Sequence, residues 1–240
     1  MHPTTRRRTL LAALPLLAAP PLLTACENAE APQRRALIAF LTTRAAAGGG
    51  LRLPVPTAEE RTAFGPYAAH WDVIRDFHAA MDARVAGPYR TVAGATAPTT
   101  LQDIVPVAKR DELARAREAI GRIRTALAEE FAKTEAARNA LRQPDDLRAA
   151  YDPVFDRLVR TPARIFGTAF PLMEEALAAT ERLGELIAAN LVRLRVSGNN
   201  LEVRDASLRA RLDAQMNEVR TSGAALQDAQ RRLLDLMNGR

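Results

Sequence analysis

The 240-residue chain contains one cysteine, and aromatic residues make up only 5% of it. With a single cysteine, no disulfide can form within the chain, so the fold does not depend on one. The three serines, Ser197, Ser207 and Ser222, do not lie in a Gly-x-Ser-x-Gly turn, which excludes that kind of hydrolase nucleophile. Few aromatic residues and many alanines favour helices over sheet. The composition therefore predicts a helical chain without a catalytic serine.

Histidine is also scarce, and two of the three histidines, His70 and His78, lie eight residues apart in one predicted helix. Side chains three or four residues apart meet on a helix, whereas a spacing of eight is too wide for one metal ion. We expect His78 to be partly buried and His70 to be solvated. The sequence predicts no metal, no other cofactor and no catalytic residues, so we expect a protein that is not an enzyme.

The basic charge of the chain does not indicate a nucleic-acid partner. The formal net charge is +6, but removing residues 1–25 would remove three arginines and no acidic residue, leaving +3. The remaining arginines alternate with glutamate and aspartate, as on a solvated helix face, rather than forming a basic cluster. We therefore expect no binding to nucleic acid.

The start of the chain has the pattern of a bacterial lipoprotein signal. Three arginines, Arg6 to Arg8, precede an apolar run from Leu10 to Leu23. The run ends in Leu23-Thr24-Ala25-Cys26, a lipobox, in which the cysteine sulfur is acylated and cleavage leaves Cys26 as the new N-terminus. The sequence predicts a cleaved signal peptide over residues 1–25. The lipid on Cys26 would hold the protein on a bacterial membrane, facing the periplasm.

Alternatives to this interpretation concern the anchor, the export route and the membrane. A transmembrane anchor is disfavoured, because prolines interrupt the run and it is shorter than the roughly 20 apolar residues that a span needs. The sequence Thr5-Arg6-Arg7-Arg8-Thr9-Leu10-Leu11 also resembles a twin-arginine signal, and general and twin-arginine export both stay open. Glu27, rather than an aspartate, follows the cysteine, which weakly favours the outer membrane over the inner one.

Periodicity predicts one mostly α-helical domain over residues 33–240, after a short polar spacer in residues 26–32. It is a bundle of long amphipathic helices with one β-hairpin between the last two helices. Helices are expected over residues 32–47, 57–86, 107–141, from 145 to about 170, 171–191, and from 205 onward. Gly87-Pro88 should end the second helix, and Thr161-Pro162 should restart the fourth.

Two local patterns, one in the helix over residues 107–141 and one in the hairpin, give more detailed predictions. Apolar residues recur every seven positions along residues 113–141, and Ala116, Ile123 and Ala137 fill the second core position. Val192, Leu194 and Val196, then Leu201 and Val203, alternate with charged residues around Ser197-Gly198-Asn199-Asn200, which predicts the hairpin. Its apolar face should pack on the helices, with Val196 opposite Leu201, and its Gly198-Asn199 tip should be mobile.

The candidate binding residues are an aromatic stripe in the second helix. Trp71, Phe77 and Met81 recur at helical spacing in the most aromatic part of the chain. Such a stripe is usually part of a hydrophobic core, but the same side chains could line an apolar ligand pocket.

Several short motifs resemble the YiaF-type bacterial lipoproteins, a family of unknown function. They are, in chain order, Gln33-Arg34-Arg35-Ala36-Leu37-Ile38-Ala39-Phe40-Leu41, Phe64-Gly65-Pro66-Tyr67, Ala80-Met81-Asp82, Leu141-Arg142-Gln143-Pro144-Asp145-Asp146-Leu147 and Thr161-Pro162-Ala163. The resemblance covers the chain from the lipobox to the last helix. It implies no catalytic residues, because none are assigned in the family.

Two functions from different classes follow from these observations. The first is a non-enzymatic structural or interaction module, held at the membrane and presenting helix surfaces to an envelope protein partner. The second is a carrier or sensor that binds a small apolar ligand between helices. A large apolar cavity near Trp71 would favour the carrier, whereas a long solvent-facing surface of exposed apolar residues would favour the interaction module.

Overall fold

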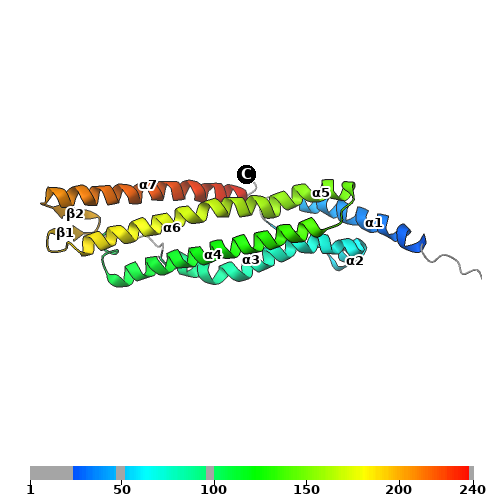
Figure 1. Cartoon of the computed structure of the whole chain (residues 1–240), viewed down its shortest axis with the longest axis horizontal. Coiled ribbons are helices and arrows are strands. Elements are labelled where there is room, and N and C mark those ends of the chain that lie inside the picture. Colours follow the sequence, from blue (N-terminus) through cyan, green and yellow to red (C-terminus); the bar gives the residue numbers. More distant parts are fainter. Residues whose placement is uncertain (1–23, 47–51, 96–99, 238–240) are drawn as a thin grey trace, which may run out of the picture.

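The computed structural model describes residues 24–46, 52–95 and 100–237 and places them in an elongated stack of long helices (Figure 1). A two-stranded antiparallel hairpin lies between the last two helices. This confirms the predicted fold class, a mostly α-helical bundle with one hairpin. The first described helix lies at one end of the molecule, and the hairpin lies at the other end.

Long helices with short connections make up most of the described chain. In order, the elements are α1 (Thr24–Phe40), the π-turn η1 (Leu41–Ala45), α2 (Ala58–Phe64), the 3-10 turn η2 (Gly65–Tyr67), α3 (Ala68–Ala95), α4 (Val107–Ala140), α5 (Asp145–Phe155), the π-turn η3 (Asp156–Arg160), α6 (Thr161–Ala188), β1 (Leu194–Ser197), β2 (Asn200–Val203) and α7 (Ala206–Met237). No residue separates α5, η3 and α6, so they form one helix. At 1.5 Å per residue this helix is about 66 Å long.

The long helices lie side by side in a row. α4 lies between α3 and α6, and α6 lies between α4 and α7 (Figure 1). In the part of the chain that the structure describes, α3 packs chiefly on α4 and has little contact with α6 or α7. The row is therefore open, unlike a closed four-helix bundle in which the first and last helices also touch. Because α3 and α6 both pack on α4 and have little contact with each other, no helix fills the space between their facing sides.

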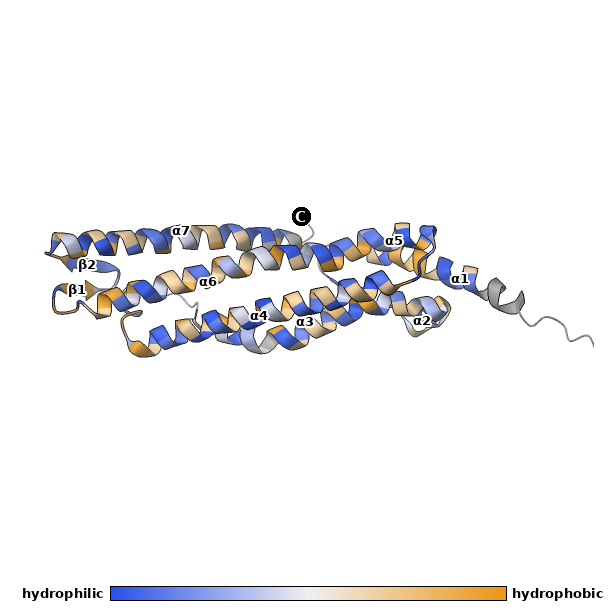
Figure 2. Cartoon of the chain, viewed as in Figure 1, coloured by the Kyte–Doolittle hydropathy of each residue, from blue (hydrophilic) through white to orange (hydrophobic). Residues whose placement is uncertain are grey.

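The buried side chains form two hydrophobic clusters, one toward each end of the row. The larger cluster joins α1, α3, α4, α5 and the start of α6, and includes Trp71, Tyr151 and Ile120. The smaller cluster joins the end of α6, the hairpin and the start of α7, and includes Ile187 and Leu212. Apolar and polar residues alternate along α4, α6 and α7, as expected for helices that bury one side (Figure 2).

The seven-residue repeat in α4 is confirmed for most of its length. Its buried members are Leu113, Ala116, Ile120, Ile123, Leu127 and Thr134. Ala137, predicted as a core residue, is exposed instead. An α-helix drifts by about 20° per heptad from a strict seven-residue repeat, so a position at the edge of the stripe turns toward solvent after a few heptads.

Two helices are longer than predicted. α1 begins at Thr24, so residues 26–32, predicted as a spacer, are helical. α3 continues past Gly87-Pro88, predicted as its end, to Ala95. A proline inside a helix removes one hydrogen bond, here to the carbonyl of Arg84. Val92 and Ala95 are each 4% exposed in the larger cluster, and their burial outweighs that local cost.

The hairpin has the predicted register. Val196 lies opposite Leu201, and Arg195 lies opposite Glu202. Leu194 and Val203 are buried in the smaller cluster, so the apolar face packs on the helices as predicted. Val192, predicted as part of that face, lies before β1 and is 96% exposed, because pairing begins only at Leu194.

The hairpin tip has partners that the sequence did not indicate. The N–H of Leu101 donates to Asn199 Oδ1 at 3.1 Å, and the N–H of Gln102 donates to the carbonyl of Gly198 at 3.1 Å. The N–H of Gly198 donates to Gln102 Oε1 at 3.2 Å. The tip is therefore hydrogen-bonded to the segment before α4, a set of contacts that the prediction of a mobile tip did not include.

Gly184, near the end of α6, allows the segment before α4 to lie close against α6. A Cβ at Gly184 would lie 2.5 Å from the carbonyl oxygen of Ile104, a backbone atom that cannot move aside easily. A Cβ at Gly167, in the same helix, would have no neighbour within 4 Å. The close packing of the segment on α6 thus depends on a glycine at position 184.

We expect Gly184→Ala to lower the free energy of unfolding by about 1–3 kcal/mol, because it forces overpacking. Gly167→Ala should raise it by about 0.5–1 kcal/mol, because alanine is the better helix former. Urea denaturation of both variants and the parent chain measures the difference. Equal effects of the two substitutions would contradict the described approach of Ile104.

Candidate functional site

The structure separates the three side chains of the predicted aromatic stripe. Trp71 is fully buried in the larger cluster, where its ring meets Phe40 edge-on at 4.9 Å between centroids. Phe77 and Met81, further along α3, line a cavity between α3, α4 and α6, and Trp71 does not. Two of the three predicted residues, Phe77 and Met81, therefore line the cavity, whereas Trp71 belongs to the hydrophobic core beside it.

The cavity has a volume of about 590 Å³ and an almost entirely apolar lining. α4 forms its floor with Ile120, Ile123 and Leu127. One wall is α3, which contributes Phe77, Met81, Val85 and Val92, and the other is α6, which contributes Pro162, Phe166, Ala169, Phe170 and Met173. Ligand pockets in proteins have volumes of about 300–1,000 Å³, so this cavity is large enough for a small molecule.

The cavity exists because the row of helices is open. α3 and α6 each pack on α4 and barely touch one another, so their facing side chains have no helix between them. The lining residues of α6 run from Pro162 to Phe170 and Met173, a distance of about 17 Å at 1.5 Å per residue. The space is therefore elongated along the helices, which suits a chain more than a compact ring system.

One hydrogen bond joins the two walls at the end of the cavity near η3. Pro162 has no N–H, so it cannot donate to the carbonyl four residues earlier, that of Leu158. His78 Nε2, from α3, lies 2.8 Å from this carbonyl oxygen. Because a carbonyl only accepts, His78 must carry a proton on Nε2. His78 thus supplies to the Leu158 carbonyl the hydrogen bond that Pro162 cannot donate.

The helix that forms the α6 wall is not broken at Thr161-Pro162, where we predicted a restart. The π-turn η3 precedes this pair, and the Thr161 N–H donates to the carbonyl of Asp156, five residues earlier. This wider turn, together with the bond from His78, lets the helix pass Pro162 without ending. The wall of the cavity is therefore continuous with α5.

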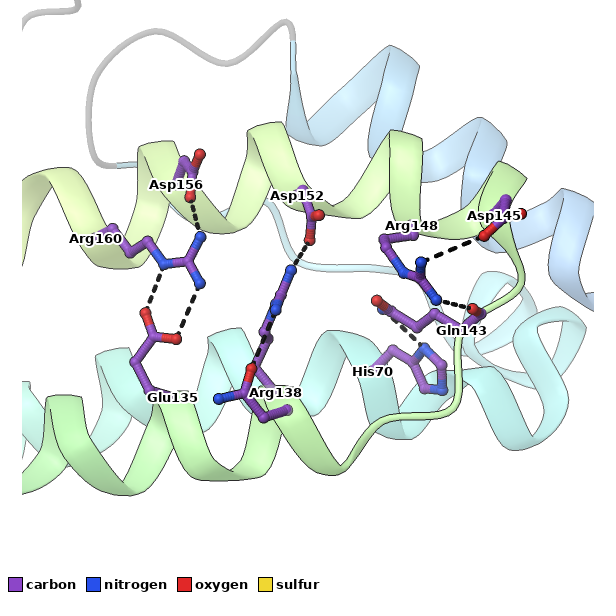
Figure 3. A network of polar contacts seen from close by, with 10 residues as sticks. His70, Glu135, Arg138, Gln143, Asp145, Arg148, Asp152, Asp156 and Arg160 are labelled. Atoms are coloured by element: carbon purple, nitrogen blue, oxygen red, sulfur yellow. Dashed lines mark hydrogen bonds and ion pairs between the residues drawn. The ribbon is translucent and has the colours of Figure 1, made fainter.

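Ion pairs hold this long helix to α4 beside the cavity (Figure 3). Arg160 Nε and Nη2 donate to the two carboxylate oxygens of Glu135 at 2.5 and 3.0 Å, a bidentate pair. Arg138 donates to Asp152 at 2.5 Å. The bonds from Arg160 lower the pKa of Glu135. These contacts fix the spacing between α4 and the part of the long helix formed by α5 and η3, next to the cavity residue Pro162.

Burial affects both described histidines. His70, predicted to be solvated, is 7% exposed, and Gln143 lies 3.2 Å from its Nδ1. This prediction is wrong because the segment after α4 covers His70 (Figure 3). His78 is half-buried, as predicted. Burial lowers the pKa of both imidazoles, although the Leu158 carbonyl and Asp82 oppose the shift at His78.

The α6 wall is the part of the site that sequence analysis missed. Phe166, Phe170 and Met173 follow helical spacing, so their shared face was visible in the sequence. Nothing in the sequence indicated that this face would lie opposite Phe77 and Met81 across α4. Long-range pairing of helices depends on tertiary packing, which spacing within one helix does not encode.

The predicted lipidation site is only partly described. Thr24, Ala25 and Cys26 lie in α1, whereas Leu23 lies outside the described residues. Within the ranges that the structure describes, no helix is long and apolar enough to cross a membrane. Over the same ranges, no group of three or more His, Cys, Asp or Glu side chains could hold a metal ion.

The lowered histidine pKa values predict a pH dependence of stability. An unfolded histidine has a pKa of about 6.5, so on acidification the unfolded chain binds protons before the folded chain does. The free energy of unfolding should therefore be highest above pH 6.5 and fall as the pH drops from about 6.5 through the lowered pKa values. Urea denaturation between pH 7.5 and 5.5 measures this.

The control is His78→Gln combined with His70→Asn, since the Gln amide overlays imidazole Nε2, which bonds Leu158, the Asn amide overlays Nδ1, which faces Gln143, and neither amide titrates. The double variant should lose stability less steeply over this pH range than the parent chain. Identical slopes for the two proteins would show that the histidines do not cause the dependence.

The chain is similar to a protein family of unknown function and to proteins whose names give no function. The chain matches the family described as "Protein of unknown function (DUF3053)" over residues 14–234. It is 26% identical over 184 residues to proteins named "Uncharacterized protein YiaF" from Escherichia coli K12, Escherichia coli O157:H7 and Shigella flexneri, covering 75% of each chain. No solved structure has a significant match. The chain belongs to the DUF3053 family, as the resemblance to YiaF-type proteins predicted.

Proposed function

We propose that this protein binds a long apolar molecule in the cavity between α3, α4 and α6, as a carrier or sensor held at a bacterial membrane by a lipid on Cys26. The observation that carries the proposal is the cavity itself, with its volume of about 590 Å³ and apolar lining. An apolar molecule would bury the facing side chains of α3 and α6, which no helix covers, and each Å² of apolar area removed from water contributes about 25 cal/mol.

The alternative, an interaction module for a protein partner, has less support. Among the described residues, the large apolar side chains that are exposed lie on four separate segments: Val55, Val107, the adjacent pair Leu191 and Val192, and Leu234. Single exposed apolar residues are normal on a protein surface and do not form a docking patch. The cavity, in contrast, gathers apolar residues of three helices around one space.

The lipid anchor in this proposal is supported by the sequence pattern at residues 1–26. The basic residues, the apolar run and Leu23-Thr24-Ala25-Cys26 follow one another in the order of a lipoprotein signal. Such an anchor would keep the cavity close to a bilayer, which is the main store of long apolar chains in a cell envelope.

Cys26→Ala tests the anchor. We expect the variant to take up no label from an alkyne-tagged palmitate supplied to the cells and to keep residues 1–25, because acylation requires the thiol. The unmodified chain in the same cells should be labelled and shortened. In-gel fluorescence and mass spectrometry measure the two properties. Labelling of the variant would refute lipidation at Cys26.

Ala169→Phe tests the cavity. Ala169 is 5% exposed and lines the α6 wall, so a phenyl ring there should fill part of the space. We expect the affinity for 1-decanol to fall by about tenfold or more, which is at least about 1.4 kcal/mol. Stability should be nearly unchanged, because the ring enters an apolar space rather than a packed core. Titration calorimetry of the full chain in lipid nanodiscs measures the affinity.

The matched control is Ala210→Phe, since Ala210 is an exposed position on α7 away from the cavity. Both variants are compared with the parent chain in the same nanodiscs, so that heat from decanol entering the lipid cancels. Equal affinity of the parent chain and Ala169→Phe would refute binding in this cavity.

A further inference from the structure

The polar groups of the cavity lie on one wall only. Arg75, His78 and Asp82, which we name the polar rim, all belong to α3 and lie within two turns of one another. The floor on α4 and the wall on α6 contribute only apolar residues. An amphiphile bound here would therefore place its head group against the polar rim and its chain along α6.

The cation of the polar rim is already neutralised. Arg75 Nη1 lies 2.6 Å from an Asp72 carboxylate oxygen, and Arg75 Nη2 lies 2.7 Å from Asp76. Arg75 Nε also donates to Asp76 at 3.0 Å. An anionic head group would have to displace these carboxylates before it could pair with Arg75.

The carboxylate of the polar rim, that of Asp82, has no such partner in the described part of the chain. Asp82 is exposed and, among the residues described, forms no ion pair with an arginine or lysine. His78, one turn earlier, donates its Nε2 proton to the carbonyl of Leu158. Asp72 and Asp76 do not line the cavity and are paired with Arg61 and Arg75, so Asp82 is the carboxylate of the rim that is left for a ligand.

We propose that the ligand is a single-chain amphiphile with a cationic, ammonium-type head group, whose positive charge pairs with Asp82. This proposal rests on the proposed function and names its ligand class. The apolar chain supplies affinity by leaving water along α6, and the charge of the head group decides which amphiphiles bind. Anionic amphiphiles of the same chain length are disfavoured by the unpaired carboxylate.

The test compares three probes with the same chain: decylammonium, 1-decanol and decanoate. Titration calorimetry of the full chain in lipid nanodiscs at pH 7.5 gives their dissociation constants, with Ala169→Phe in the same nanodiscs as the reference for entry into lipid. We expect decylammonium to bind about two- to fivefold more tightly than decanol, as for an exposed ion pair, and decanoate to bind more weakly than decanol. The differences should shrink as salt is added.

Asp82→Asn isolates the head-group contact. It should weaken decylammonium binding by about two- to fivefold, leave decanol unchanged and tighten decanoate. The matched control is Asp213→Asn, an exposed carboxylate on α7 outside the cavity, which should change none of the three. A decanoate affinity equal to or above that of decylammonium, or an Asp82→Asn variant with unchanged preference, would overturn the proposal while leaving chain binding intact. Decanol that binds equally to the parent chain and Ala169→Phe would instead overturn the proposed function and this inference together.

Discussion

The structure depends on keeping the helix from Asp145 to Ala188 continuous, because α4 and α7 pack against it on either side. Three prolines, at positions 153, 162 and 171, lie in this helix, and each removes a backbone hydrogen bond. At Pro162 the loss is offset by a wider π-turn and by the imidazole of His78, which binds the carbonyl of Leu158. If the helix ended at Pro162, α4 and α7 would lose the continuous helix on which both pack.

The same hydrogen bond connects the architecture to the candidate site. His78 and Pro162 both line the cavity, so the contact that supports the long helix also ties together the two walls. The bidentate pair between Glu135 and Arg160 holds the floor at a set distance. The cavity is thus bounded by contacts between helices that do not depend on a ligand.

Several local features could be predicted because they depend on neighbouring residues. The sequence Thr57-Ala58-Glu59-Glu60 has the spacing of a capping box, and the structure forms it: Glu60 N–H donates to Thr57 Oγ1 at 3.1 Å, and the Thr57 N–H donates to the Glu60 carboxylate at 2.7 Å. The hairpin register was also correct, since alternation and turn length fix it. Predictions failed where distant residues intervene, as at Gly87-Pro88, which α3 passes because Val92 and Ala95 are buried. The contact at Asn199, whose side chain accepts from the N–H of Leu101, was likewise not visible in the sequence.

The sequence by itself determined the helical class, the limits of α4, the start of α7, the hairpin and the stripe with Phe77 and Met81, because periodicity and turn residues act over a few positions. Only the tertiary structure decided that α3 and α6 both pack on α4 and barely touch each other, and that Trp71 lies in the core rather than in the cavity. Which helices become neighbours depends on side-chain volumes and on the entropy of closing loops across the whole chain. Because these contributions come from many residues that are far apart in the sequence, no short segment of the sequence predicts them.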